Sequence, residues 1–362
     1  MKRYLILEDG TVFPGDGFGS SIITTGQLVI SNNRTGIEQS VTDPNTEGQI
    51  IAFTIPSVGN SGINRDFYES INSQCKGVVI GSSSLSTVNN SISFEEWIAS
   101  LKIPGIKNVD VRALSKHIAE HGEMKASIMD THDEHAIDQI KALVLPPDLV
   151  KRVSTRQSYP NPNMGLKIVI IDLGLKYSIL RQLSYRDCNS IIVNYNATIE
   201  EIENLHPDGI IFSNGPGDPK DLPKTIERIQ ILQKDYPILG IGLGSLLIAL
   251  ANDCQITHLP QPHHESSLAV KEVASGKIDF VNHNHSYTLD QKYIGSSDFI
   301  VTNICVADGT IEGIRHEYLP IMGVLFEPEA APGPTDGYYV FDEFIDLIES
   351  VKQQEGIRSQ WN

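Results

Sequence analysis

The chain has 362 residues, of which 40% are hydrophobic and 20% charged; this is the composition of a globular protein long enough for two or three domains. Its formal net charge of −17 disfavours nonspecific binding to nucleic acid or to anionic membranes, so we expect neither as a partner. No apolar run has the length of a membrane span or of a signal-peptide core, so we expect a cytoplasmic protein. The widely spaced cysteines Cys75, Cys188, Cys254 and Cys305 are typical of buried, reduced thiols.

Residues 1–150 predict an α/β domain. A hairpin is indicated by Asp9-Gly10 between two β-type runs, and a helix start is indicated by Ser93 and Glu96, which have the spacing of a capping box. The predicted elements are the hairpin 3–13, the strands 27–31, 50–54 and 77–80, and the helices 93–101 and 113–120. The residues of this domain show no catalytic constellation.

Residues 151–165 are rich in proline and polar side chains, which is typical of a linker between domains. From residue 166 to residue 362, apolar strands alternate with helices, and this pattern predicts a mostly parallel sheet flanked by helices on both faces. The predicted elements are the strands 167–172, 190–194, 209–212, 237–239, 299–305, 310–315 and 321–325, and the helices 178–187, 199–205, 226–235, 245–251 and 341–351.

The stretch GIGLG at residues 240–244 lies between a predicted strand and a predicted helix. This glycine spacing is typical of an elbow in which a strained central residue projects its side chain above the sheet, close to amides that stabilise an oxyanion. The central residue here is Gly242, so the elbow presents no side chain. Two other interpretations stay open: a plain glycine turn, or a dinucleotide fingerprint in which Ser245 replaces the third glycine.

Further motifs follow one another along the chain in a specific order. They are LEDGT at 7–11, TDP at 42–44, DxRAL at 110–114, SNGPGDP at 213–219 and PEAxPGP at 328–334. On these motifs the second domain resembles the class I (triad) glutamine amidotransferases, and the first resembles the domain peculiar to small subunits of carbamoyl phosphate synthetase. The resemblance covers the full length of the chain.

In that family a cysteine at the elbow attacks the side-chain amide of glutamine and ammonia is released; a histidine acts as acid and base, and a glutamate orients it. The resemblance places these three roles at Gly242, Glu327 and Glu329. It therefore implies that no catalytic residue set is intact, because nucleophile and base are both missing. Two nearby residues carry a possible nucleophile, but Ser245 lies past the apex of the elbow and Cys254 lies beyond the helix.

The resemblance also implies the positions that bind glutamine, some of them degenerate. Leu246 stands where the family has a glutamine, and Asn45 stands where it has a serine. The implied substrate positions are Asn45, Gly215, Gly217, Leu243, Leu246, Asn284, Ser286 and Tyr287. Because several polar partners are lost, we expect glutamine binding to be weak or absent.

We expect no metal and no cofactor on this chain. His263-His264 and His283-x-His285 are histidine pairs, but no cysteine or carboxylate completes a ligand set, and we interpret them as loop and turn histidines. The chain has no P-loop. The resemblance implies that ATP and a divalent metal bind to a large subunit, with which the chain forms a heterodimer.

The resemblance implies a subunit of a ligase that makes carbamoyl phosphate from bicarbonate, ATP and a nitrogen donor, for pyrimidine and arginine biosynthesis. We predict a non-catalytic subunit, a pseudo-glutaminase, whose complex uses free ammonia. Two alternatives stay open. The chain is a regulatory or competing paralogue of an active small subunit, or it is an active glutaminase whose nucleophile is not recognised.

Overall fold

The computed structural model divides the chain into two compact units, which we call unit 1 and unit 2. Unit 1 consists of Met1–Leu149 and Pro260–Glu265, and unit 2 of Val150–Leu259 and Ser266–Asn362. The structure describes residues 1–84, 92–131, 134–295 and 297–360, so the last two residues of the second predicted domain lie outside it. Within these ranges, no helix combines the length and the apolar character that crossing a membrane requires.

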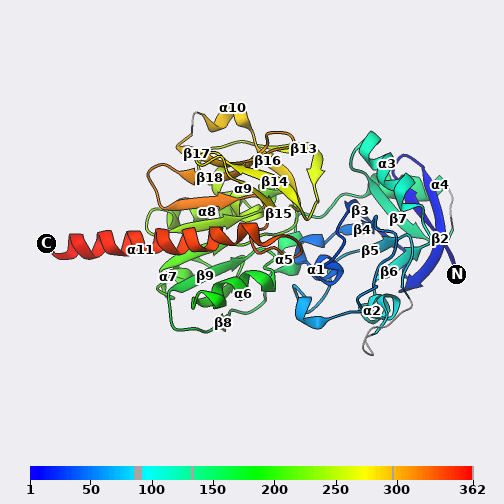
Figure 1. Cartoon of the computed structure of the whole chain (residues 1–362), viewed down its shortest axis with the longest axis horizontal. Coiled ribbons are helices and arrows are strands. Elements are labelled where there is room, and N and C mark those ends of the chain that lie inside the picture. The colour runs from blue at the N-terminus through cyan, green and yellow to red at the C-terminus, as the bar shows by residue number, and fades with distance from the viewer. Residues whose placement is uncertain (85–91, 132–133, 296, 361–362) are drawn as a thin grey trace. The chain divides into compact units, whose positions relative to one another are not determined.

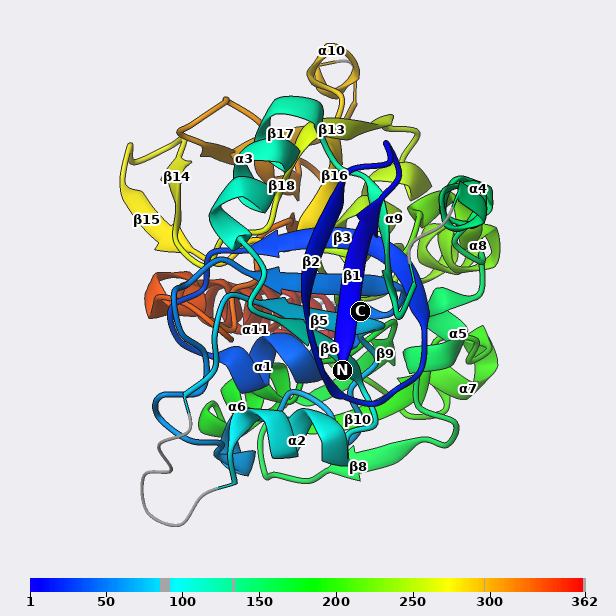
Figure 2. The same cartoon turned by 90° about the vertical axis from the view of Figure 1, so that its right-hand side faces the viewer.

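Unit 1 is built on a closed barrel with the strand order β1-β2-β6-β5-β4-β3-β7. Its strands are β1 (Lys2–Leu7), β2 (Val12–Gly19), β3 (Thr24–Ser31), β4 (Gln49–Phe53), β5 (Gly77–Ile80), β6 (Pro104–Lys107) and β7 (Lys125–Met129). The predicted hairpin is confirmed, because β1 and β2 pair antiparallel (blue in Figure 2). The barrel closes because β7 pairs with both β1 and β3.

Short helices accompany the barrel. They are α1 (Ile37–Thr42), α2 (Phe94–Ser100), α3 (Val111–His121) and α4 (Glu134–Ala142), with the 3-10 turns η1 (Pro44–Thr46) and η2 (Arg65–Phe67). The predicted capping box is confirmed at α2, where Ser93 and Glu96 each accept a hydrogen bond from the other's backbone N–H. Helix α3 begins earlier than predicted because the Asp110 carboxylate caps it by accepting from the Ala113 N–H.

Unit 2 contains a sheet with the strand order β15-β14-β17-β18-β19-β12-β11-β9-β10-β8, and a two-stranded sheet of β13 and β16. The strands are β8 (Tyr159–Asn161), β9 (Lys167–Asp172), β10 (Asn189–Asn194), β11 (Gly209–Phe212), β12 (Ile238–Ile241), β13 (Ile256–His263), β14 (Leu268–Glu272), β15 (Ile278–Val281), β16 (His285–Leu289), β17 (Phe299–Cys305), β18 (Ile311–His316) and β19 (Ile321–Val324). From β19 to β10 neighbouring strands are parallel, as predicted.

Helices cover both faces of this sheet, which confirms the predicted α/β layering (Figure 1). They are α5 (Leu149–Val153), α6 (Tyr177–Tyr185), α7 (Ile199–Glu203), α8 (Pro223–Leu232), α9 (Leu243–Ala251), α10 (Gln291–Ile294) and α11 (Tyr339–Gln360), with the 3-10 turns η3 (Pro219–Asp221) and η4 (Thr335–Tyr338). Alternate residues of the strands point to opposite faces. One set packs with α7, α8 and α9, and the other packs with α6 and α11.

Several boundaries differ from the prediction. Strand β12 runs to Ile241 instead of residue 239, and α9 begins at Leu243 instead of residue 245, because the glycine-rich turn is tighter than a loop. Helix α8 begins at Pro223, since proline suits the first turn of a helix. The stretch 151–165, expected as a linker, contains β8, which pairs antiparallel with β10.

All four cysteines are free and buried, as expected for reduced thiols. Burial raises the pKa of Cys75 and Cys188 to about 11. It also raises the pKa of Cys254 and Cys305. Such thiols stay protonated near neutral pH, which makes them poor nucleophiles.

Candidate functional site

The candidate site lies where parallel strands of unit 2 end. β9, β11, β12 and β19 are neighbours in the sheet and run in the same direction, so their carboxyl ends share one edge. Ligand sites of open α/β sheets form at this edge. Four chain segments follow these strands: residues 173–176, the loop 213–219, Gly242 and residues 325–329.

Gly242 forms the turn between β12 and α9. Its φ of 54° and ψ of −112° lie outside the regions that residues with a side chain readily adopt. Its N–H donates to the Val324 carbonyl (2.8 Å), and its carbonyl accepts from the Leu246 N–H (3.2 Å). The structure therefore contains the strained strand–turn–helix elbow that the glycine spacing predicts.

The two flanking glycines are required by close packing, whereas the central one is not. A Cβ on Gly244 would overlap the Phe212 carbonyl, and a Cβ on Gly240 would lie 2.6 Å from the Ser245 nitrogen. A Cβ on Gly242 would make ordinary contact with Asn214, at 3.4 Å from its Cβ. The elbow thus keeps the space for a side chain at its apex.

Glu327 and Glu329, the family positions of the base and its orienting partner, both contact Lys176. The Lys176 Nζ lies 2.7 Å from Glu327 Oε2 and 2.8 Å from Glu329 Oε1, and it donates to the Ala331 carbonyl at 2.5 Å. Lys176 is 0% exposed, Glu327 5% and Glu329 1%. The contacts with Glu327 and Ala331 are hydrogen bonds, and the contact with Glu329 is an ion pair.

Other contacts hold this ion cluster in place. Asn282 donates from its side-chain amide to Glu327 Oε2, and its carbonyl accepts from the Glu327 N–H at 2.8 Å. Asp172, at the end of β9, accepts from the N–H groups of Gly174 and Leu175, at 3.0 and 2.8 Å, and so fixes the turn before Lys176. Burial raises the pKa of Asp172, although its hydrogen bonds to backbone N–H groups oppose that shift.

The sequence analysis missed Lys176. It lies four residues after the end of β9, whose four central residues are apolar, at the same sheet edge as the elbow; this position was the signal available in the sequence. A lysine buried at such an edge needs anionic partners, because an unpaired buried charge is strongly destabilising. Glu327 and Glu329 supply them from the loop that follows β19.

The expected glutamine positions of unit 2 fall into two groups. Leu243 and Leu246 are buried in the apolar core on the α9 face, at 5% and 3% exposure, so Leu246 presents no amide and packs as a core residue. Gly215 and Gly217 lie in the loop after β11; a Cβ on Gly215 would overlap the Leu173 carbonyl, and Gly217 has a φ of 97°.

The remaining positions lie elsewhere. Asn284 immediately precedes β16, and Ser286 and Tyr287 are part of it. The Tyr287 hydroxyl donates to Asp218 Oδ2 at 3.1 Å, which ties β16 to the loop that carries Gly217. Asn45 belongs to unit 1, where it is buried in η1 and its N–H donates to the Asp43 carboxylate at 2.8 Å.

The two nearby side chains that carry a possible nucleophile, Ser245 and Cys254, are both buried. Ser245 is 1% exposed, and its Oγ faces β19: it lies 2.5 Å from where a Cβ on Gly323 would be. Cys254 follows the end of α9 and is 4% exposed. Burial raises the pKa of its thiol.

Comparisons with known proteins agree with this architecture. Residues 169–347 match the family described as glutamine amidotransferase class-I, and residues 5–128 match the carbamoyl-phosphate synthase small chain, CPSase domain. Small chains of carbamoyl phosphate synthase from Lactococcus lactis subsp. cremoris and Streptococcus pneumoniae are each 46% identical, over 97% of this chain and 99% of theirs. The pyrimidine-specific small chain of Lactiplantibacillus plantarum is 43% identical over the whole of both chains.

Proposed function

Since the chain belongs to the family of carbamoyl phosphate synthase small chains, we propose that it is a small chain that binds a large chain but does not hydrolyse glutamine. The side-chain-free elbow at Gly242 carries this proposal. Covalent release of ammonia from a carboxamide needs an attacking atom, and the apex offers only backbone. The large chain, with its ATP and divalent metal, would then take its nitrogen from free ammonia.

The ion cluster supports the same conclusion. A general base must exchange a proton with the reacting group. Glu327 instead accepts from Lys176 and Asn282 and is almost fully buried. It therefore acts as a structural carboxylate that compensates the buried Lys176 charge.

The test uses the chain purified in complex with its large chain. We expect carbamoyl phosphate to form from ammonia, bicarbonate and ATP, and no glutamate to form from glutamine above background. Ser245→Ala and Cys254→Ala are the control variants. Glutamate release that is lost in one of them would identify a substitute nucleophile and refute the proposal; release that survives in both would refute it as well.

A regulatory small chain is the second candidate, favoured by the glycines that remain around the substrate loop. Gly215 and Gly217 allow the tight backbone of that loop, and Asn284 is the residue that the family has at its position. Without the amide replaced by Leu246, desolvated glutamine loses a hydrogen-bond partner, so we expect no micromolar binding by calorimetry. Micromolar binding would favour a glutamine-sensing regulator.

The pathway served is the remaining part of the function. The relative from Lactiplantibacillus plantarum carries the name pyrimidine-specific, and its identity of 43% extends over the whole chain. This supports pyrimidine synthesis as the pathway. Deletion of the gene should then cause a growth requirement for a pyrimidine and not for arginine; the reverse requirement would contradict the assignment.

A further inference from the structure

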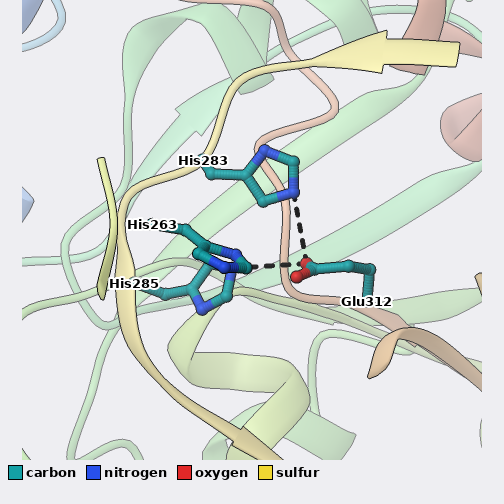
Figure 3. A group of neighbouring side chains, drawn as sticks. All are labelled: His263, His283, His285 and Glu312. Carbon is teal, nitrogen blue, oxygen red and sulfur yellow. Dashed lines mark ion pairs between the residues drawn. The ribbon is translucent and has the colours of Figure 1, made fainter. Parts of the chain in front are cut away.

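We propose that His283, His285 and Glu312 of unit 2 form a binding site for a divalent transition-metal ion, with zinc as the ion that best suits these ligands. Figure 3 shows the three side chains directed toward one another. Their ligand atoms all lie within 4.8 Å of each other. His263, which Figure 3 also labels, belongs to segment 260–265 of unit 1 and is no part of the proposed ligand set.

The sequence analysis excluded a metal here because no carboxylate completes the histidine pair. That premise is wrong. His283 lies in the loop before β16, His285 begins β16, and Glu312 comes from β18, a strand that lies against β16 in space. The carboxylate is therefore supplied by the folded sheet, from a part of the chain that local spacing does not reveal.

The distances from the Glu312 carboxylate to the two rings fit one small ion. Glu312 Oε2 lies 3.3 Å from His283 Nε2 and 3.2 Å from His285 Nε2. Zinc binds such nitrogen and oxygen atoms at about 2.0–2.2 Å in tetrahedral geometry, which separates neighbouring ligand atoms by about 3.3–3.4 Å. Each ring nitrogen is thus spaced from the carboxylate oxygen as a neighbouring ligand of one zinc ion would be, and the two ring nitrogens lie within 4.8 Å of each other.

Surrounding contacts orient the ligands. The ring Nδ1 of His283 lies 3.2 Å from the Val281 carbonyl, and that of His285 lies 3.0 Å from the Tyr287 carbonyl. A carbonyl accepts only, so each Nδ1 carries a hydrogen, and each Nε2 faces the Glu312 carboxylate. Such hydrogen bonds from the second ring nitrogen are typical of metal-binding histidines.

The Glu312 carboxylate is oriented in the same way. The Thr310 hydroxyl lies 3.2 Å from its Oε1 and 2.8 Å from Asp308 Oδ1, so its single hydrogen is shared between two carboxylates, while Oε2 is directed at the two rings. His283, His285 and Glu312 are 1%, 7% and 0% exposed. A buried carboxylate that faces two imidazole nitrogens needs a compensating positive charge between them.

A proton and a metal ion are the two ways to supply that charge. A single proton bridges one nitrogen–oxygen pair, whereas a single metal ion binds both Nε2 atoms and the carboxylate together. Imidazole and carboxylate are ligands of zinc and similar first-row ions. Convergence of both rings on the same carboxylate oxygen favours the metal.

The proposed ion would hold a functionally placed segment. His283 and His285 flank Asn284, a family glutamine position, and Asn282 on the same segment binds Glu327. Anchoring this segment to β18 would fix the positions of Asn282 and Asn284. Three protein ligands leave the fourth tetrahedral position for a water molecule or another ligand.

The test measures metal binding by the full-length chain, first stripped with a chelator and then titrated with Zn²⁺. We expect one bound zinc per chain, and a tetrahedral absorption spectrum when Co²⁺ replaces it. Glu312→Gln and His285→Gln should each weaken binding by at least about 100-fold. His316→Gln is the control. His316 lies in β18, is as exposed as His285 and does not belong to the proposed ligand set, so the variant protein should bind zinc as tightly as the wild type.

Two results would overturn the proposal. Absence of stoichiometric binding in the stripped, folded wild-type chain would mean that a shared proton, and no metal, neutralises the cluster. Equal affinity in Glu312→Gln, His285→Gln and wild type would place the metal elsewhere. If a variant fails to fold, the wild-type titration still tests the proposal. Zinc should raise the melting temperature of the folded wild-type chain, and Co²⁺ in place of zinc should give a tetrahedral absorption spectrum.

Discussion

The Nζ of Lys176 lies 2.7 Å from Glu327 Oε2, so the residue at the family position of the catalytic base neutralises a buried lysine. Glu329 contributes a second carboxylate at 2.8 Å from the same atom. Lysine and both glutamates are almost completely buried, so solvent hardly screens their interaction. Lys176, Glu327 and Glu329 thus form an ion cluster in the interior of unit 2.

Removing the lysine should destabilise the protein strongly. Lys176→Met leaves Glu327 and Glu329 as two buried carboxylates without their cation, and breaking a buried pair in this way costs about 3–5 kcal/mol. Chemical denaturation followed by circular dichroism measures the loss. In the Lys176→Met/Glu327→Gln double variant one carboxylate charge is removed, so the loss should be smaller than in the single variant.

Lys352→Met is the matched control, since it breaks a lysine–carboxylate pair at the surface. Lys352 lies 2.7 Å from Asp208, but its side chain is 51% exposed. Exposed pairs contribute at most about 1 kcal/mol. Similar decreases in the free energy of unfolding in Lys176→Met and Lys352→Met would show that the buried cluster stabilises the fold no more than a surface pair does.

Close packing at the elbow predicts a sharp difference between two glycines. Gly244→Ala forces a Cβ into the Phe212 carbonyl and should lower the free energy of unfolding by about 1–3 kcal/mol. Gly295→Ala meets no atom within 4 Å at a φ of −69°, so its effect should stay below about 1 kcal/mol. Equal effects in urea denaturation would contradict the packing at α9.

A thiol placed at the apex should be reactive. In Gly242→Cys the side chain has room and lies at the N-terminus of α9, where the helix dipole stabilises a thiolate. We expect it to react with iodoacetamide near neutral pH faster than the four native thiols, whose pKa values are raised by burial. Mass spectrometry of the alkylated peptides distinguishes them.

The repair of chemistry is a separate step. Gly242→Cys with Glu327→His restores nucleophile and base, but we expect glutaminase turnover to require Ser245→His and Leu246→Gln as well, because binding is a separate deficit. A thiol at position 242 that alkylates no faster than an unstructured cysteine would mean that the elbow does not activate it.

The pair of Arg186 and Asp342 predicts a pH-dependent contribution to stability. Arg186 binds both carboxylate oxygens of Asp342, at 2.6 and 2.8 Å, and so links α6 to α11. Hydrogen bonds from Arg186 lower the pKa of Asp342 below its ordinary value. The contribution is therefore present above the unfolded-state pKa of about 3.9 and is lost as the pH falls through the lower folded-state value.

Because the Asp342 side chain is 60% exposed, Asp342→Asn should cost at most about 1 kcal/mol at neutral pH. Urea midpoints of the variant and the wild type should differ near pH 7 and converge as the pH falls through the lowered folded-state pKa of Asp342. A difference that grows in acid would reverse the assigned sign.

The sequence predicts well those elements whose signal is local. The apolar runs of β9 and β11 are recovered to the residue, because strands buried on both faces contain few polar interruptions. β13, β14, β15 and β16 were missed, since their burial alternates and polar residues and prolines weaken the apolar pattern. Barrel closure also escaped prediction, because β7 pairs with β1 across most of unit 1.

In the candidate site, too, the local features were predicted from the sequence and the non-local ones were not. The elbow at Gly242 is a local motif, and its strained backbone follows from the glycine spacing. The partners of Glu327 are non-local: Lys176 follows another strand, and only the strand order of the sheet brings the two together. For the same reason the carboxylate beside His283 and His285 was not found.

The backbone at position 242 has one more consequence, for the direction in which this site can evolve. At its φ of 54° and ψ of −112°, a residue with a Cβ carries a strain of about 1–3 kcal/mol that glycine avoids. Gly242→Cys alone should therefore lower stability, and under the proposed function Glu327 and Leu246 would still stand in the way of turnover. Under that proposal, selection for a folded chain would disfavour cysteine at position 242 as the first step toward glutamine hydrolysis.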